Sequence, residues 1–238
     1  MLDQKFWKKN FKVYDVLNKS IPYQQLMGEI IKEADIKNQD IVLDAGCGSG
    51  NFEFWLRQKK QSIKVKVIGL PNSPDGLEIY KKKIKGANVI LCDLTEKLPF
   101  KDNHFDKIVS NNVIFTIKHE QRTDVLRELR RVLKPGGKII ISNIKYDWSP
   151  LMIYVYSIKE ELARNGLLKV FILFLKTLIP TLRLLYYNTY IVREAYFGDY
   201  RCMDECEQVK KLTKAGFKNI SEDKHGYANQ AIMNSGEK

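Results

Sequence analysis

The chain has 238 residues, 44% of them hydrophobic, which suits one α/β domain with an elaboration or at most two small domains. Its 40 Lys and Arg outnumber 28 Asp and Glu, giving a formal net charge of +12. That balance would suit nucleic acid, an anionic membrane surface or an acidic substrate. The lysines are scattered along the chain, so an ordinary solvated surface explains the charge equally well.

The spacing of the four cysteines excludes a disulfide framework, and no long apolar stretch follows the N-terminus. We therefore expect a reducing, cytoplasmic setting. Cys202 and Cys206 are four residues apart and would share a helical face. No histidine or further cysteine completes a ligand set nearby, so we expect no metal site.

Hydrophobic periodicity predicts amphipathic helices in residues 1–40, interrupted at Ile21-Pro22 and resuming over 23–34. Strands and helices then alternate. We expect strands at 41–43, 65–70, 89–92, 106–110 and 138–142, and helices at 52–59, 74–85 and 120–133. This alternation predicts a mostly parallel sheet covered by helices on both faces. Ligands of such sheets bind in a crevice at the carboxyl ends of the strands.

The alternation stops at residues 146–201, which are rich in Leu, Ile, Phe and Tyr. A helix at 204–215, ended by Gly216, and two closing strands at 217–221 and 226–233 are expected after it. The whole chain, 1–238, is therefore interpreted as one domain. Its parts are a helical cap (1–40), a ligand-binding core (41–145), an inserted hydrophobic lid (146–201), and a C-terminal helix with closing strands (202–238).

The segment Val42–Gly50 predicts a strand that runs into a glycine-rich turn. Gly46, Gly48 and Gly50 would let the backbone turn tightly and approach a ligand without a Cβ clash. The following helix offers free N–H groups and a positive dipole end, and Asp44 could receive a cationic group. The spacing G-x-G-x-G lacks one residue of the dinucleotide fingerprint G-x-G-x-x-G, which disfavours a dehydrogenase.

At this point the chain closely resembles class I S-adenosylmethionine-dependent methyltransferases with a type 11, quinone-methyltransferase-like core. Asp44–Gly50, with Cys47 inside the turn, is similar to the motif that holds the cofactor's amino-acid end. Cys92-Asp93-Leu94 resembles the adenine-binding stretch, and Phe105–Asn112 the strand beside the transferred methyl group. Residues 126–137 resemble the helix and turn before the fifth strand, and Tyr14-Asp15 an N-terminal pair that folds over the cofactor.

This resemblance implies a Rossmann-like seven-stranded sheet, S-adenosyl-L-methionine as cofactor, and a set of cofactor-binding residues. That set is Tyr14, Asp44, Gly46, Cys47, Gly48, Gly50, Asn72, Asp93, Leu94, Ser110 and Asn111. No paired carboxylates or nucleophile–base arrangement is evident, so no catalytic residue is assigned. One position departs from the family: Pro71 stands where an acidic residue usually holds the ribose hydroxyls. Asn72 or Asp75 would have to replace it.

The segment 166–187 combines long apolar runs with Lys169, Lys176 and Arg183, which are seven apart and so lie near one line on a helix. Pro180 is expected to kink or end that helix. The apolar runs are too short to predict a transmembrane span. The segment fits a lid, a homodimer interface, or a helix lying on a membrane. An aromatic pocket is expected from Asn143, Tyr146, Trp148, Tyr154, Tyr156 and Tyr190.

The sequence therefore predicts a methyltransferase acting on a small or lipophilic substrate. Two alternatives stay open. The first, an RNA methyltransferase, is favoured by the +12 charge, but Ser110–Val113 lacks the Asn/Asp-Pro-Pro-aromatic tetrad and the insertion is apolar, so nucleic acid is not the expected partner. The second is a non-catalytic protein with a degenerate cofactor site, which Pro71 suggests.

Overall fold

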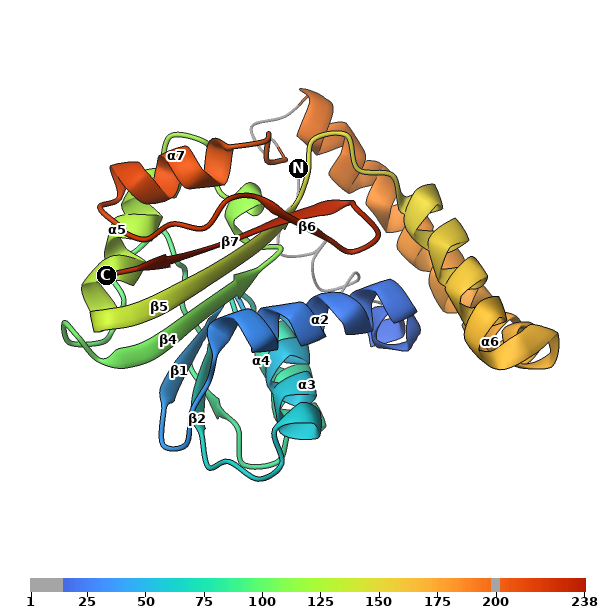
Figure 1. Cartoon of the computed structure of the whole chain (residues 1–238), viewed down its shortest axis with the longest axis horizontal. Helices are drawn as coiled ribbons and strands as arrows, with labels where there is room; N and C mark the ends of the chain where they lie inside the picture. The colour runs from blue at the N-terminus through green and yellow to red at the C-terminus, as the bar shows by residue number, and fades with distance from the viewer. Residues whose placement is uncertain (1–14, 198–201) are drawn as a thin grey trace.

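The computed structural model describes residues 15–197 and 202–238, apart from the side chains of 173 and 194–197. Its seven-stranded sheet has the order β3-β2-β1-β4-β5-β7-β6 (Figure 1). β1 to β5 are parallel, and β7 is antiparallel to both of its neighbours. The strands are β1 (Ile41–Ala45), β2 (Lys66–Leu70), β3 (Asn88–Val89), β4 (Phe105–Asn111), β5 (Leu133–Ile144), β6 (Lys224–Gly226) and β7 (Ala231–Glu237).

The helices cover both faces of this sheet, which confirms the predicted fold class. α2 contacts α3, α5 contacts α7, and the two pairs lie on opposite faces (Figure 1). The helical elements are η1 (Asp15–Lys19), α2 (Ile21–Ala34), α3 (Asn51–Lys59), α4 (Pro74–Lys83), η2 (Ile114–Thr116), α5 (Arg122–Val132), α6 (Pro150–Phe197) and α7 (Glu207–Lys214).

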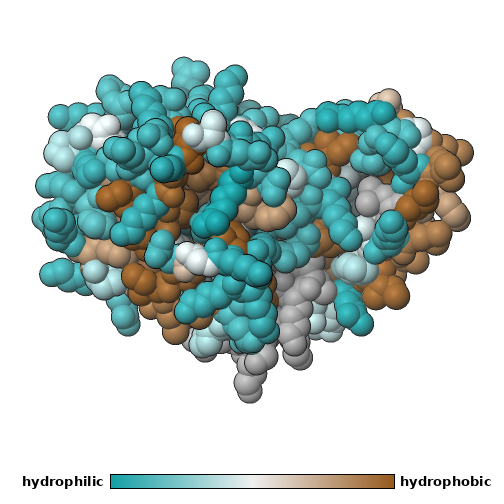
Figure 2. All heavy atoms as spheres, turned by 90° about the horizontal axis from the view of Figure 1, so that it is seen from below, coloured by the Kyte–Doolittle hydropathy of each residue, from teal (hydrophilic) through white to brown (hydrophobic). Residues whose placement is uncertain are grey.

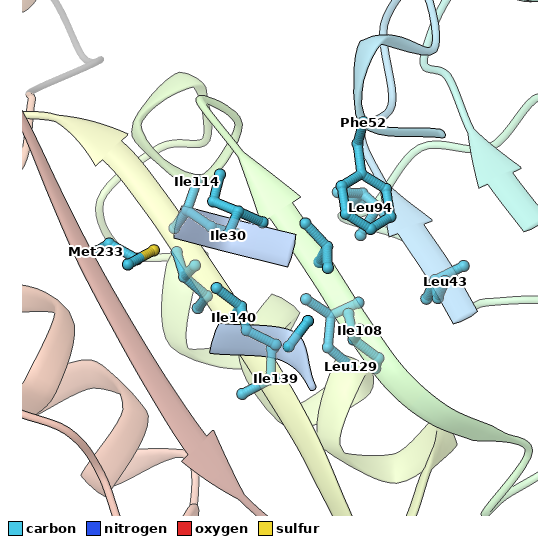
Figure 3. Packing of buried hydrophobic residues seen from close by; sticks show 14 of the residues in the cluster. Ile30, Leu43, Phe52, Leu94, Ile108, Ile114, Leu129, Ile139, Ile140 and Met233 are labelled. Carbon is cyan, nitrogen blue, oxygen red and sulfur yellow. The ribbon is translucent and has the colours of Figure 1, made fainter. Parts of the chain in front are cut away.

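The core consists of apolar side chains that alternate between the two faces of the central strands. Ile108 of β4 and Ile139 of β5 are partners in register, and Leu129 of α5 packs beside them (Figure 3). Ile140 points to the opposite face because side chains alternate along a strand, and there it meets α2, which carries Ile30. This double burial holds the carboxyl ends of β1 and β4 side by side.

Several local expectations differ from the structure. α2 begins at Ile21, two residues before the expected start, and Pro22 lies in its first turn, because a proline there lacks only an N–H that the helix does not use. The expected strand at 217–221 is reduced to a single bridge between Lys218 and Glu237. Cys202 and Cys206 do not share a helical face, because α7 begins after Cys206, which is exposed while Cys202 is buried.

α6 is a helical hairpin that projects beyond the sheet (Figure 1). Its two segments, 150–165 and 167–197, are separated at Gly166, whose φ of 76° and ψ of 171° are not helical. Pro180 was expected to kink or end the helix, but the chain remains helical on both sides of it. Gly166 breaks the helix because only glycine adopts this backbone conformation without strain. None of the described helices is long and apolar enough to cross a membrane.

Candidate functional site

The glycine-rich turn begins where β1 ends and leads into α3. Gly46, Gly48 and Gly50 have φ values of 74°, 51° and 78°, which is the left-handed region that favours glycine. A Cβ atom on Gly46 would lie 2.5 Å from the side chain of Val113, and one on Gly50 would lie 2.5 Å from the ring of Tyr80. Both glycines are therefore required by backbone conformation and by close packing.

A cavity of about 360 Å³ lies over this turn, at the carboxyl ends of β1, β2 and β4. We call it the glycine-loop cavity. Eight of the residues expected to bind a cofactor line it: Asp44, Gly46, Cys47, Gly48, Asn72, Asp93, Leu94 and Asn111. The structure thus brings together residues from four separate stretches of the sequence. Its position agrees with the rule that parallel sheets bind ligands at the strand ends.

The other three expected residues do not line the cavity. Gly50 is the N-cap of α3 and lies behind the turn, against Tyr80. Ser110 lies between two residues of β4 and is fully buried. Ser110 does not line the cavity, and its expected contact with the ligand stays a prediction. Tyr14 lies outside the described residues.

Two buried oxygen atoms of the cavity wall have no hydrogen-bond partner within the described part of the chain. They are Oδ2 of Asp44, whose residue is 3% exposed, and Oδ1 of Asn111. Burial, reinforced by the nearby carboxylate of Glu53, raises the pKa of Asp44 well above its usual value. A buried carboxylate without a partner is costly, so this wall suits a cationic, hydrogen-bond-donating ligand group.

Glu53 is held in place from behind the cavity. Its Oε1 accepts hydrogen bonds from Nε and Nη2 of Arg57 at 2.9 and 2.6 Å, and its Oε2 accepts one from the Tyr80 hydroxyl at 2.5 Å. The negative charge of Glu53 is therefore fixed by α3 and α4, while Asp44 is left for a ligand.

A cluster that sequence analysis missed joins the N-terminal cap to the glycine-rich turn. Lys83 Nζ donates hydrogen bonds to Asp15 Oδ1 and Asn51 Oδ1, both at 2.6 Å, and to Ser49 Oγ at 3.1 Å. Burial lowers the pKa of Lys83, and its contact with Asp15 opposes this shift. Asn18 of η1 also donates to Asn51 Oδ1 at 2.8 Å. η1 is thus fixed against the wall of the glycine-loop cavity.

Pro71, which stands where similar proteins usually have an acidic residue, directly follows β2. Pro71 is buried, and its carbonyl accepts a hydrogen bond from the backbone N–H of Cys92 at 3.1 Å. Asn72 is exposed and lines the cavity, whereas Asp75 does not line it and lies in the first turn of α4. Of the two expected substitutes for an acidic side chain, only Asn72 therefore lines the cavity.

Several further residues line the glycine-loop cavity without having been expected there. They come from α2, from the glycine-rich turn and the start of α3, and from the loops after β3 and β4. The polar ones are Tyr23, Ser49, Asn51, Thr95, Asn112, Thr116, Lys118 and Gln121. A basic and an amide side chain at 118 and 121, just after a predicted strand end, were the signal that could have identified the last two.

A second cavity of about 140 Å³ lies between η1 and the two segments of α6. We call it the hairpin cavity. Asn112, at the end of β4, lines both cavities. The hairpin cavity has a mostly apolar wall: Val16, Leu17, Phe115, Ile144, Trp148, Ile153, Tyr154, Phe174, Leu184, Leu185, Ile191 and Tyr227. Its polar lining side chains belong to Lys19, Ser20, Asn112, Ser157, Thr177, Thr181 and Asn188.

The aromatic pocket expected near the insertion is correct in part. Trp148 and Tyr154 line the hairpin cavity. Tyr146 and Tyr190 are instead 43% and 42% exposed. Asn143 does not line it, because its amide is used inside the fold: Oδ1 accepts from the backbone N–H of Phe115, and Nδ2 donates to Gln208. α6 lines the hairpin cavity, and none of its described side chains lines the glycine-loop cavity.

Comparison with known proteins agrees with this geometry. The family model for the methyltransferase domain matches residues 43–141. A demethylmenaquinone methyltransferase of Staphylococcus saprophyticus is 31% identical over 150 residues, covering 61% of this chain and 63% of that protein. A Mus musculus protein named "Probable tRNA methyltransferase 9B" is 33% identical over 132 residues, covering 55% of this chain and 25% of that one. This chain thus spans less than two thirds of either relative.

A solved structure shares the fold along nearly the whole chain. It is a crystal structure of a SAM-dependent methyltransferase from Aquifex aeolicus, with a TM-score of 0.60 and 17% identity, covering 94% of this chain and 97% of that one. Together with the domain match, this places the chain in a fold class of Rossmann-like transferases. The chain therefore carries a methyltransferase domain over residues 43–141, and it is similar to S-adenosylmethionine-dependent methyltransferases in sequence and in fold, as its motifs indicated.

Proposed function

We propose that this protein transfers a methyl group from S-adenosylmethionine to a lipophilic acceptor. The observation that carries the proposal is the pair of cavities that share Asn112. One has a mixed polar and apolar lining and lies on the glycine-rich turn, and the other is mostly apolar and lies under the hairpin. An enzyme of this class needs both a cofactor site and an adjoining acceptor site, and the acceptor site here is suited to an apolar molecule.

The residues of the glycine-loop cavity fit the cofactor. The orphaned carboxylate oxygen of Asp44 would accept hydrogen bonds from the cationic amino group, and Gly46 and Gly48 would allow close backbone approach. Asp93 would lie by the adenine. Its Oδ1 accepts hydrogen bonds from the backbone N–H and hydroxyl of Thr95, both at 2.8 Å, which fix its orientation. Asn72 would take the ribose.

The sulfonium group of bound S-adenosylmethionine supplies an already activated leaving group, so little acid–base chemistry is required. The chain's own task is to hold the acceptor in line and to exclude water. Asn112 is suited to lie beside the point of methyl transfer, because it lines both cavities. Its φ of 57° is unusual, and its Oδ1 accepts the backbone N–H of Ile144 at 3.1 Å, which fixes the side chain between the two cavities.

A second candidate function is methylation of RNA, which the +12 charge and the relationship to the mouse protein favour. The relatives named for a quinone precursor and for tRNA both match little more than half of this chain. Similarity to these two relatives therefore does not decide whether the acceptor is a lipophilic molecule or RNA. The apolar lining of the hairpin cavity favours the lipophilic acceptor, since a flipped base would require more hydrogen-bonding groups.

The proposal is tested by incubating the protein with S-adenosylmethionine labelled in its methyl group and with either extracted lipids or total RNA of the source cells. Label is expected in the organic phase with lipids and not in the RNA. The Asp44→Ala variant should lose the transfer, whereas Asp35→Ala, at an exposed ion pair, should retain it. Label in RNA alone would replace the lipid acceptor with RNA. No label in either, with cofactor still bound, would favour a non-catalytic protein.

A further inference from the structure

The second segment of the α6 hairpin has two apolar faces. Its inner face lines the hairpin cavity through Phe174, Leu184 and Ile191. Its outer face points to solvent. The apolar residues there are strongly exposed: Phe171 58%, Leu175 58%, Ile179 63%, Leu182 56% and Tyr186 58%. A helix that is apolar on its solvent side requires an explanation, because contiguous exposed apolar surface of this kind marks an interaction site.

A basic stripe borders this outer face. Lys169, Lys176 and Arg183 are seven residues apart and fall near one line, at the edge of the exposed apolar surface. These three residues and Arg193 are all exposed. The sequence from 166 to 193 contains four basic residues and no acidic one. The turn between the segments adds Leu167 and Leu168, which are 75% and 73% exposed.

The apolar surface is concentrated at the hairpin end of the molecule. Figure 2 shows hydrophobic residues gathered at the side that Figure 1 assigns to α6, away from the sheet. Leu151 and Met152, on the first segment, are also strongly exposed, at 65% and 61%. The hairpin is therefore a projecting element with an apolar exterior, and residues 166–193 of its second segment carry basic side chains and no acidic one.

We propose that the outer face of α6 docks on the surface of an anionic phospholipid bilayer. Apolar side chains beside a row of lysines and arginines are what an interfacial helix requires, with the apolar side in the acyl boundary and the charges at the headgroups. A second copy of the chain fits less well. Two copies joined through this face would bring their basic stripes together, and residues 166–193 offer no acidic partner.

Docking in this way would explain why the inner face of the same helix is apolar. A lipophilic acceptor would leave the bilayer along α6 and enter the hairpin cavity, whose wall includes Phe174 and Leu184. This part of the inference rests on the proposed function. The docking itself does not, because it requires neither the cofactor nor methyl transfer.

The experiment is co-sedimentation of the full chain with vesicles, without cofactor. Vesicles of phosphatidylcholine alone are compared with vesicles that also contain phosphatidylglycerol. Wild type should sediment with the anionic vesicles, and Phe171→Ser/Leu175→Ser/Ile179→Ser should not. The matched control, Ile90→Ser/Leu91→Ser, changes residues that are 41% and 48% exposed away from the hairpin, and it should sediment like wild type.

A charge variant tests the basic stripe. Lys169→Gln/Lys176→Gln/Arg183→Gln should weaken binding to anionic vesicles by about 100-fold, because each basic residue near such a surface contributes about a factor of five. Its control, Lys64→Gln/Lys81→Gln/Lys85→Gln, removes the same charge elsewhere on the exposed surface and should have a much smaller effect.

Three outcomes would overturn the docking proposal. The first is that the wild-type protein does not sediment with anionic vesicles. The second is that the variants and their controls lose binding equally. The third is that light scattering shows a stable dimer, which the Phe171→Ser/Leu175→Ser/Ile179→Ser variant dissociates. Unchanged circular dichroism and unchanged cofactor binding show that the variants are folded. Cofactor binding with no vesicle binding would overturn the docking alone and leave the proposed methyltransferase standing.

Discussion

Asp44 lines the glycine-loop cavity, and burial of its carboxylate costs free energy of folding. Its residue is 3% exposed, one carboxylate oxygen has no partner in the described chain, and burial together with Glu53 raises its pKa. In the absence of ligand, this buried carboxylate therefore destabilises the folded protein. The stability that protonated Asp44 gives the ligand-free fold is fully present below the unfolded pKa near 3.8. It is lost as pH rises through the higher folded pKa.

We therefore predict that Asp44→Asn stabilises the ligand-free protein at neutral pH, by about 1–3 kcal/mol, because it removes a buried charge without a partner. The same change should weaken cofactor binding by about 1.5–3 kcal/mol through the lost charge-assisted bond. Thermal unfolding at several pH values and titration calorimetry measure the two effects. Asp35→Asn, at an exposed position, serves as the control and should change stability by no more than about 0.5 kcal/mol. A less stable Asp44→Asn protein at neutral pH would contradict this account of the site.

At the residue scale, sequence could identify Asp44 because it directly follows a buried strand and precedes the glycines. It could not identify the cluster of Lys83, Asp15 and Asn51, because Asp15 and Lys83 are 68 residues apart and meet only through the fold. Ser110 belongs to a motif that fixes its strand, but a motif alone does not decide which side chains of the strand line the cavity.

At the scale of elements, α5 and α7 hold the loop after β4 through one buried cation. Arg122 is fully buried and donates hydrogen bonds to the carbonyls of Phe115 and Ile117, both at 2.9 Å. It also donates to Glu207 Oε1 of α7 at 3.1 Å. Burial lowers the pKa of Arg122, and the charge of Glu207 opposes that shift. Because Ile117 lines the glycine-loop cavity, this contact connects α7 to the site.

Arg122→Met is predicted to destabilise the protein by about 3–5 kcal/mol, since it leaves two buried carbonyls without their donor and removes the cation that pairs with the half-buried carboxylate of Glu207. Denaturant unfolding measures the change. On the same helix, Arg127 forms an exposed pair with Asp124, and Arg127→Met should cost no more than about 0.5 kcal/mol. Equal effects of the two substitutions would show that the buried contact does not hold the loop.

Sequence patterns predicted the elements of the alternating core but not those of the hairpin or of residues 217–221. The alternating core was predicted well because buried parallel strands leave continuous apolar runs. The hairpin was not, because Pro180 was expected to kink or end the helix, whereas the non-helical residue that separates its two segments is Gly166. Near the end of the chain, 217–221 reads as a strand by composition. It forms only a single bridge, because Gly226 and Ala231 close the β6–β7 hairpin, and that hairpin supplies the outer strands of the sheet.

At the scale of the whole molecule, the structure contains two cavities and one projecting hairpin. The sheet with its glycine-rich turn forms the glycine-loop cavity, and η1 with α6 encloses the hairpin cavity. Sequence alone predicted eight residues that line the first, since they lie in motifs of fixed spacing, but not those from α2 and from the loop after β4. It could not predict that the apolar insertion faces both a cavity and solvent, because a helix that is apolar around most of its circumference does not reveal which side is covered.

The central claim is that the glycine-loop cavity binds S-adenosylmethionine even though Pro71 replaces the usual acidic ribose ligand. Isothermal titration calorimetry of the full chain with this cofactor tests it most directly, with Asp44→Ala as the control. We predict binding at one site per chain, in the range of about 1 μM to 1 mM that is usual for enzyme ligands, and strong loss of that binding in the variant. No detectable heat of binding by the wild-type protein at millimolar cofactor would contradict the claim.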